Sequence, residues 1–146
     1  MILRFILFLF LTFCFSKAEV FFDYTYKFTL SKDEKASVKI KEIDYPDEIY
    51  YFDFSWTLFD QTNIIVHSRY KRYPRQFVMS LRRNLNWVDQ TLVPDYKNPH
   101  IDRARLILEF SDFKKNEAIF TIYIEDRDKR LEVEFLDPRK ATLNQN

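Results

Sequence analysis

Apolar and polar residues alternate along most of this chain, and that period of two constrains the fold more than any other feature. From Val20 to Leu30 the even positions are apolar or aromatic, whereas polar residues take most of the odd positions. The pattern returns in residues 49–59, where one side of the segment carries Tyr50, Phe52, Phe54, Trp56 and Leu58. A period of two is typical of half-buried β-strands, so the sequence predicts an all-β chain.

Polar turn signals divide the chain into short segments of this kind. The expected strands are residues 20–30, 37–44, 49–59, 64–70, 105–110, 118–125 and 130–136. Because a short polar link joins each pair, we expect 20–30 to form a hairpin with 37–44, and 120–125 to form another with 130–136.

Residues 75–88 fit two patterns. Phe77, Met79, Leu81, Leu85 and Trp87 suit one face of a strand, whereas Val78, Leu81, Leu85 and Val88 suit a helical stripe. The β-rich surroundings and the asparagines at 84 and 86, which are weak helix formers, favour a strand.

About seven or eight short strands with regular turn signals predict a two-sheet antiparallel β-sandwich of immunoglobulin-like architecture. A single domain at 19–138 and a polar tail at 139–146 complete the expected organisation. The alternatives are a small β-barrel and a sandwich with one helix at about 75–88.

The chain contains no glycine. Average usage of about 7% would give roughly ten in this length. Dinucleotide fingerprints, phosphate-binding P-loops, EF-hand loops and G-x-S-x-G nucleophile elbows are therefore excluded. We also expect turns that are longer and more polar than two-residue glycine hairpins, as at 60–63 and 126–129. Asp60 or Asn63 is expected to supply the left-handed backbone conformation.

The first 18 residues resemble a cleavable secretory signal. Arg4 precedes an apolar run at 5–15, and Ser16 and Ala18 offer the small residues that a signal peptidase requires. Bulky Phe13 before Cys14 disfavours a lipid anchor. Cys14 is also the only cysteine, so the expected mature chain has no disulfide. A bacterial periplasmic location, or secretion, follows as a prediction.

The sequence offers only weak candidates for catalytic or metal-binding residues. His67 and His100 are the only histidines, and His67 points away from neighbouring Ser68 on a strand. A triad of Asp53, His67 and a serine is conceivable, but nothing in the sequence requires it. The pairs His100 with Asp102 and Asp126 with Asp128 each offer two metal ligands, fewer than a zinc site takes. We predict no enzyme, no metal and no cofactor.

The strongest functional signal is the charge distribution. Residues 61–88 contain six basic residues and no acidic ones, whereas 19–60 contain ten acidic and five basic residues. Five of the six bases are arginines, which bind carboxylates and phosphates bidentately. The candidate partner-binding residues are Arg69, Tyr70, Lys71, Arg72, Tyr73, Arg75, Arg82 and Arg83. The alternative is that these bases pair with acids of neighbouring strands.

The sequence therefore favours a non-enzymatic interaction or structural module of the cell envelope. Its expected partner is an acidic protein surface, with a lipid headgroup or an anionic polysaccharide as further options and nucleic acid excluded by export. Contact with a membrane is expected only through the signal segment. The alternative function is a carrier that holds an apolar ligand among Tyr50, Phe52, Phe54 and Trp56.

Overall fold

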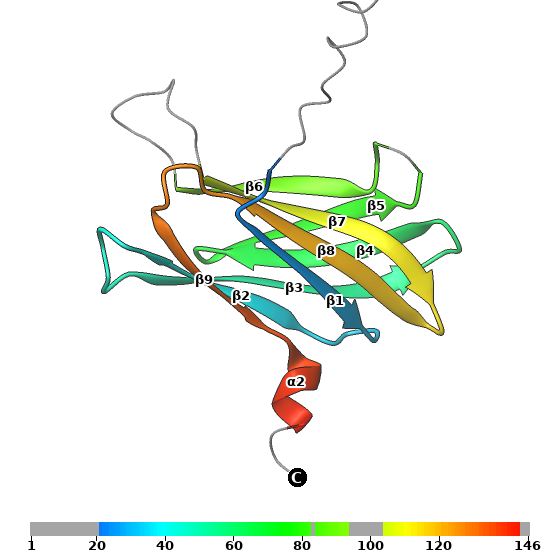
Figure 1. The fold of residues 1–146 in the computed structure, drawn as a ribbon. Helices are drawn as coiled ribbons and strands as arrows, with labels where there is room; N and C mark the ends of the chain where they lie inside the picture. Colours follow the sequence, from blue (N-terminus) through cyan, green and yellow to red (C-terminus); the bar gives the residue numbers. More distant parts are fainter. Residues whose placement is uncertain (1–20, 83, 94–103, 144–146) are drawn as a thin grey trace, which may run out of the picture.

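The chain folds into two antiparallel β-sheets that pack face to face (Figure 1). A computed structural model describes residues 21–82, 84–93 and 104–143. Its four-stranded sheet has the order β1 (Tyr24–Leu30), β8 (Glu117–Glu125), β7 (Ala104–Lys114), β6 (Trp87–Val93). Its five-stranded sheet has the order β5 (Tyr73–Ser80), β4 (Asn63–Tyr70), β3 (Ile49–Phe59), β2 (Ala36–Glu42), β9 (Leu131–Leu136). The predicted sandwich is confirmed, and the barrel is not formed.

Aromatic side chains fill the space between the sheets, as the alternation predicts. Phe54 of β3 meets two rings of the opposite sheet, Phe28 at 5.4 Å and Phe120 at 5.5 Å between centroids, both edge to face. All three rings are buried. Burial of each such side chain stabilises the fold by about 1.5–3 kcal/mol, so this layer holds the two sheets together.

Both predicted hairpins are wrong. β1 pairs with β8 rather than β2, and β2 pairs with β3 and β9. The links 31–35 and 126–130 therefore cross from one sheet to the other. Alternation identifies which side chains face the core, but it carries no information about which strand lies alongside.

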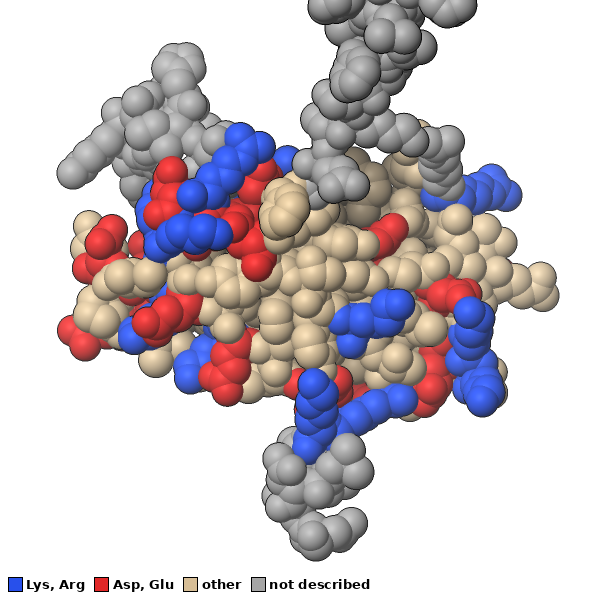
Figure 2. Space-filling view, viewed as in Figure 1, with Lys and Arg blue, Asp and Glu red and all other residues tan. Residues whose placement is uncertain are grey.

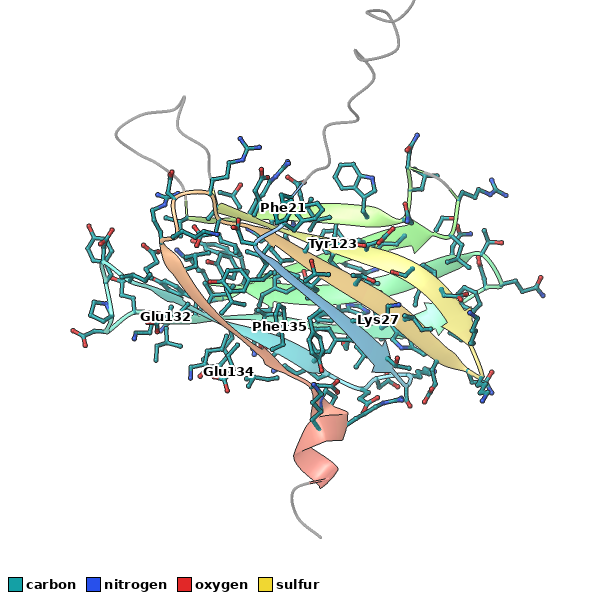
Figure 3. The ribbon with its side chains drawn as sticks, in the orientation of Figure 1. Phe21, Lys27, Tyr123, Glu132, Glu134 and Phe135 are labelled. Carbon is teal, nitrogen blue, oxygen red and sulfur yellow. The ribbon has the colours of Figure 1, made fainter. Side chains whose placement is uncertain are left out.

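Side chains close the open seam between the edge strands β1 and β9. The Tyr26 ring stacks on Phe135 at 4.8 Å, and the Tyr24 hydroxyl donates to the Leu131 carbonyl at 2.9 Å. Figure 3 shows Phe135 directed between the sheets, whereas Glu132 and Glu134 on the same strand point away.

The expected polar tail begins with a short helix, α2 (Pro138–Leu143). Arg139 at its start donates to Glu117, and the Lys140 ammonium lies 4.8 Å from the centre of the Tyr26 ring. These contacts hold the start of the expected tail, 139–146, against the sandwich, whereas the sequence alone describes it only as polar.

The ambiguous stretch 75–88 contains no helix among its described residues. It includes most of β5 and the start of β6, which are joined by the loop 81–86. The strand prediction is confirmed for both ends, and the predicted single strand is interrupted in the middle.

Tight turns form without glycine because other residues adopt left-handed backbone angles. Lys71 and Arg72 have φ of 48° and 71° between β4 and β5, and Lys115 and Asn116 have φ of 53° and 63° between β7 and β8. Two successive positive φ angles match the type I′ hairpin turn. The expectation of longer turns is wrong at these two places. At the β3–β4 turn Gln61, not Asp60 or Asn63, has the positive φ.

A buried carboxylate shapes the link from β8 to β9. Asp126 accepts hydrogen bonds from the backbone N–H groups of Arg130 and Leu131, at 3.0 and 2.9 Å. Asp126→Ala should lower the free energy of unfolding by about 2–4 kcal/mol, because buried donors lose a charged acceptor. Urea denaturation measures the loss, and Asp128→Ala in the same link is the exposed control. Equal effects of the two substitutions would contradict this role.

Candidate anion-binding groove

The outer face of the five-stranded sheet carries a row of polar side chains set by strand register. Arg69 of β4 lies opposite Asp53 of β3, Asp53 lies opposite Ser37 of β2, and Ser37 lies opposite Leu136 of β9. The row is close to the β4–β5 hairpin, so the residues of that turn lie beside it.

Two cations converge on one buried carboxylate within this row. Asp53 Oδ2 lies 2.7 Å from Arg69 Nη2 and 3.0 Å from Lys35 Nζ, and Asp53 Oδ1 accepts from the Ser37 hydroxyl at 2.7 Å. Burial alone would raise the pKa of Asp53. The hydrogen bonds from Ser37, Arg69 and Lys35 outweigh burial and hold this pKa below its ordinary value. Asp53 is therefore a charged anchor that fixes Arg69 and Lys35.

A groove of about 780 Å³ opens over this cluster. Its basic lining comes from Lys35, Arg69, Lys71 and Arg72, with Asp53 as the acidic lining residue. Its remaining lining residues are Ser37, Ile49, Tyr50, Tyr51 and Leu136. A surface with four cations, one carboxylate and an apolar side suits an anion attached to an apolar group.

Two of the groove cations, Lys71 and Arg72, differ from the other lysines on this face. Lys39 and Lys41 pair with Glu134 and Glu132 across β2 and β9, each at 3.0 Å. In contrast, Arg72 has no carboxylate within ion-pair distance among the residues that the structure describes. The Lys71 ammonium lies 4.1 Å from the centre of the Tyr50 ring, a cation–π contact that leaves its charge unneutralised.

The predicted basic segment is thus split between three places. Arg69, Lys71 and Arg72 meet in the groove. Exposed Tyr73 and Arg75 lie on edge strand β5, where Arg75 donates to Gln90 at 3.2 Å. Arg82 lies in the loop beyond the other end of β5, and Arg83 lies outside the described residues.

Tyr70 is wrong as a contact residue. Its side chain is buried in the core, and its hydroxyl donates to the Leu92 carbonyl at 2.8 Å. Burial also raises the pKa of Tyr70, so the hydroxyl stays protonated. As an even-numbered residue of β4, Tyr70 shares the inner face with Ile64 and Val66, a periodicity that could have identified it as core.

Sequence reasoning missed Lys35, Tyr51 and Leu136 as groove residues. They come from the β1–β2 link, from β3 and from β9, and strand pairing across the sheet brings them together. The alternative of internal pairing is confirmed for Arg69 and does not hold for Arg72. On the side of the molecule seen in Figure 2, basic and acidic side chains are intermingled.

In the conceivable catalytic triad, Asp53 bonds a serine, Ser37, but His67 bonds neither of them. His67 Nε2 lies 3.1 Å from the Thr57 hydroxyl, whereas both Asp53 oxygens are bonded to Ser37, Arg69 and Lys35. Ser68 is buried on the opposite face of β4. Within the described residues, no group of three or more histidine, cysteine or acidic side chains could hold a metal ion. His100 and Asp102 lie outside those residues.

The aromatic strand proposed to line a carrier cavity is packed instead. Phe52, Phe54 and Trp56 are buried, and rings of the opposite sheet contact Phe54 and Trp56. These three side chains therefore form part of the hydrophobic core of the sandwich.

Comparisons with protein-family models, curated proteins and solved structures give no match to this chain. None of the helices in the described part of the chain is long and apolar enough to cross a membrane.

The Asp53 cluster generates a pH prediction. Because the folded-state pKa lies below the value of about 3.9 for an unfolded chain, the charged carboxylate stabilises the fold above that pH. This stabilisation is lost as pH falls through the folded-state pKa. Asp53→Asn should lower the free energy of unfolding by about 1–3 kcal/mol at neutral pH, and the difference should shrink as pH falls below about 3.9.

Urea denaturation at several pH values measures this difference, with exposed Asp47→Asn as the control. A deficit of constant size down to the lowest pH would show that Asp53 acts through packing rather than charge.

Proposed function

We propose that this protein is a non-enzymatic exported interaction module of the cell envelope, which binds an acidic segment of a partner protein in the groove beside the β4–β5 hairpin. The observation that carries the proposal is the unpaired charge there. Arg72 and Lys71 meet no carboxylate among the described residues, although acidic side chains neutralise Lys39 and Lys41 on the same face.

Backbone strain in the hairpin supports the same site. Left-handed conformation costs an ordinary residue roughly 1–2 kcal/mol, and Asn-Gly is the favoured pair for a type I′ turn. Lys71 and Arg72 occupy those positions instead. The turn therefore costs stability, and it projects two long cations beside the groove.

The binding mechanism follows from the charges and the apolar lining. Long-range attraction steers an acidic surface toward the hairpin. Arg69 is then positioned by Asp53, since Nε and Nη2 both bond Oδ2 and Nη1 remains available to a partner carboxylate. Apolar side chains of the partner can cover Ile49, Tyr51 and Leu136, three partly exposed residues of the groove.

The two hairpins provide a matched experiment. Lys71→Asn/Arg72→Gly should raise the free energy of unfolding by about 1–2 kcal/mol, because the new residues suit the turn. The same variant should weaken binding of a poly-glutamate peptide by about tenfold or more. Thermal denaturation and isothermal titration calorimetry measure the two effects.

Lys115→Asn/Asn116→Gly is the control, since it also relieves a type I′ turn but lies away from the groove. It should stabilise the fold and leave peptide binding unchanged. If the wild-type chain does not bind the peptide, or if both hairpin variants bind it equally well, the groove is not the contact site.

A further inference from the structure

A second hollow adjoins the groove on the outer face of the five-stranded sheet. It measures about 340 Å³, and Lys35, Asp53 and Arg69 line both hollows. The other residues that line the second hollow include Ser55, His67 and Pro74. The ion-paired cluster around Asp53 is therefore a shared border. We name the groove and the second hollow together the trough.

The basic side chains of the trough follow the direction of β4. Arg69 and His67 are alternate residues of this strand, so their side chains share its outer face, and Lys71 follows them in the hairpin turn. Because a strand rises about 3.3 Å per residue, alternate side chains repeat at about 6.6 Å. A peptide in extended conformation has the same repeat. Carboxylates at every second residue of such a peptide therefore match the spacing of Arg69 and His67.

Both residues keep a nitrogen atom that can bond a carboxylate. Arg69 uses Nε and Nη2 for Asp53, at 3.2 and 2.7 Å, and Nη1 remains. His67 is half-buried, and its Nε2 lies 3.1 Å from the Thr57 hydroxyl. The other ring nitrogen, Nδ1, has no hydrogen-bond partner among the residues that the structure describes. A protonated His67 ring can therefore donate to a carboxylate in the second hollow.

The surroundings of His67 leave room for an added negative charge. Across the sheet, His67 lies opposite Ser55 of β3 and Gln76 of β5, which are both uncharged. The charged residues that line the second hollow are Lys35, Arg69 and Asp53. A protonated His67 thus gives this hollow three cations against one carboxylate, and that excess favours an anionic ligand.

We propose that the acidic segment of the partner binds in extended conformation along β4, with carboxylates at alternate residues. One carboxylate bonds Arg69, and the next bonds protonated His67 in the second hollow. Further along the segment, Lys71 and Arg72 attract the acidic residues that lie over the groove. This inference rests on the proposed function, because it specifies the sequence pattern and the pH range in which the same surface binds its partner.

Two capped octapeptides of equal composition test the spacing. In four repeats of Glu-Ser, the glutamates stand at alternate positions, whereas two repeats of Glu-Glu-Ser-Ser contain no pair of glutamates at that spacing. Only the first peptide can place carboxylates at both Arg69 and His67. At about pH 5.5 we expect the full chain to bind it about three- to fivefold more tightly than the second peptide. Isothermal titration calorimetry measures both affinities.

The affinity for the alternating peptide should also depend on pH. Histidine changes charge between about pH 5 and 8, whereas glutamate side chains, with a pKa of about 4.3, remain mostly ionised there. Asp53 also remains charged, because its hydrogen bonds hold its pKa below the ordinary value. Binding should therefore be about three- to fivefold tighter at about pH 5.5 than at about pH 8.

Histidine variants assign this pH dependence. His67→Gln should remove most of the gain at low pH and most of the preference for the alternating peptide. His100→Gln, which changes the other histidine of the chain, is the matched control and should keep both. Circular dichroism shows whether each variant is folded.

Other outcomes would overturn the inference. They are equal affinities of the wild-type chain for the two peptides, or a pH dependence that survives His67→Gln. If Lys71→Asn/Arg72→Gly still weakens binding of both peptides in that case, the alternate spacing is rejected and the proposed function is retained. Failure of the wild-type chain to bind either peptide rejects both.

Discussion

The aromatic layer between the two sheets is the interaction on which the rest of the structure depends. Phe54 contacts Phe28 and Phe120 of the opposite sheet, and Phe135 contacts Tyr26 at the seam. These rings occupy the interior, where they are buried and packed against one another. The candidate sites instead lie on an outer face, where register and turns place charged and apolar groups together.

The lack of glycine determines which residues form the exposed turns, as the aromatic rings determine the packing of the interior. Turns that would normally contain glycine are built from Gln61, Asn84 and the pairs Lys71–Arg72 and Lys115–Asn116, all with positive φ. Each long side chain held in such a turn projects from the end of a hairpin. Because the chain has no glycine, Lys71 and Arg72 form the β4–β5 turn, and this turn projects both cations beside the groove.

Period-two alternation predicted the sandwich, the bounds of β3 and the inner residues of most strands. It could not predict strand partners. Two strands that pair in one sheet and two strands that lie in facing sheets show the same alternation, and both proposed hairpins are wrong. One bulge in β3 reversed the expected side of Leu58. The charge count drew attention to Arg69, Lys71 and Arg72, which line one groove, but Lys35 and Leu136 join them only through pairing across the sheet. Tyr70 was misassigned because its charged neighbours hid its place in the alternation.

We propose the outer face of the five-stranded sheet, beside the β4–β5 hairpin, as the binding surface. Nuclear magnetic resonance of the isotope-labelled chain, titrated with a poly-glutamate peptide, can locate the contact residue by residue. We expect concentration-dependent shifts of the backbone amides of Lys35, Asp53 and residues 69–72, with the amides of the four-stranded sheet unchanged. Shifts centred on another surface, or none at all, would contradict it.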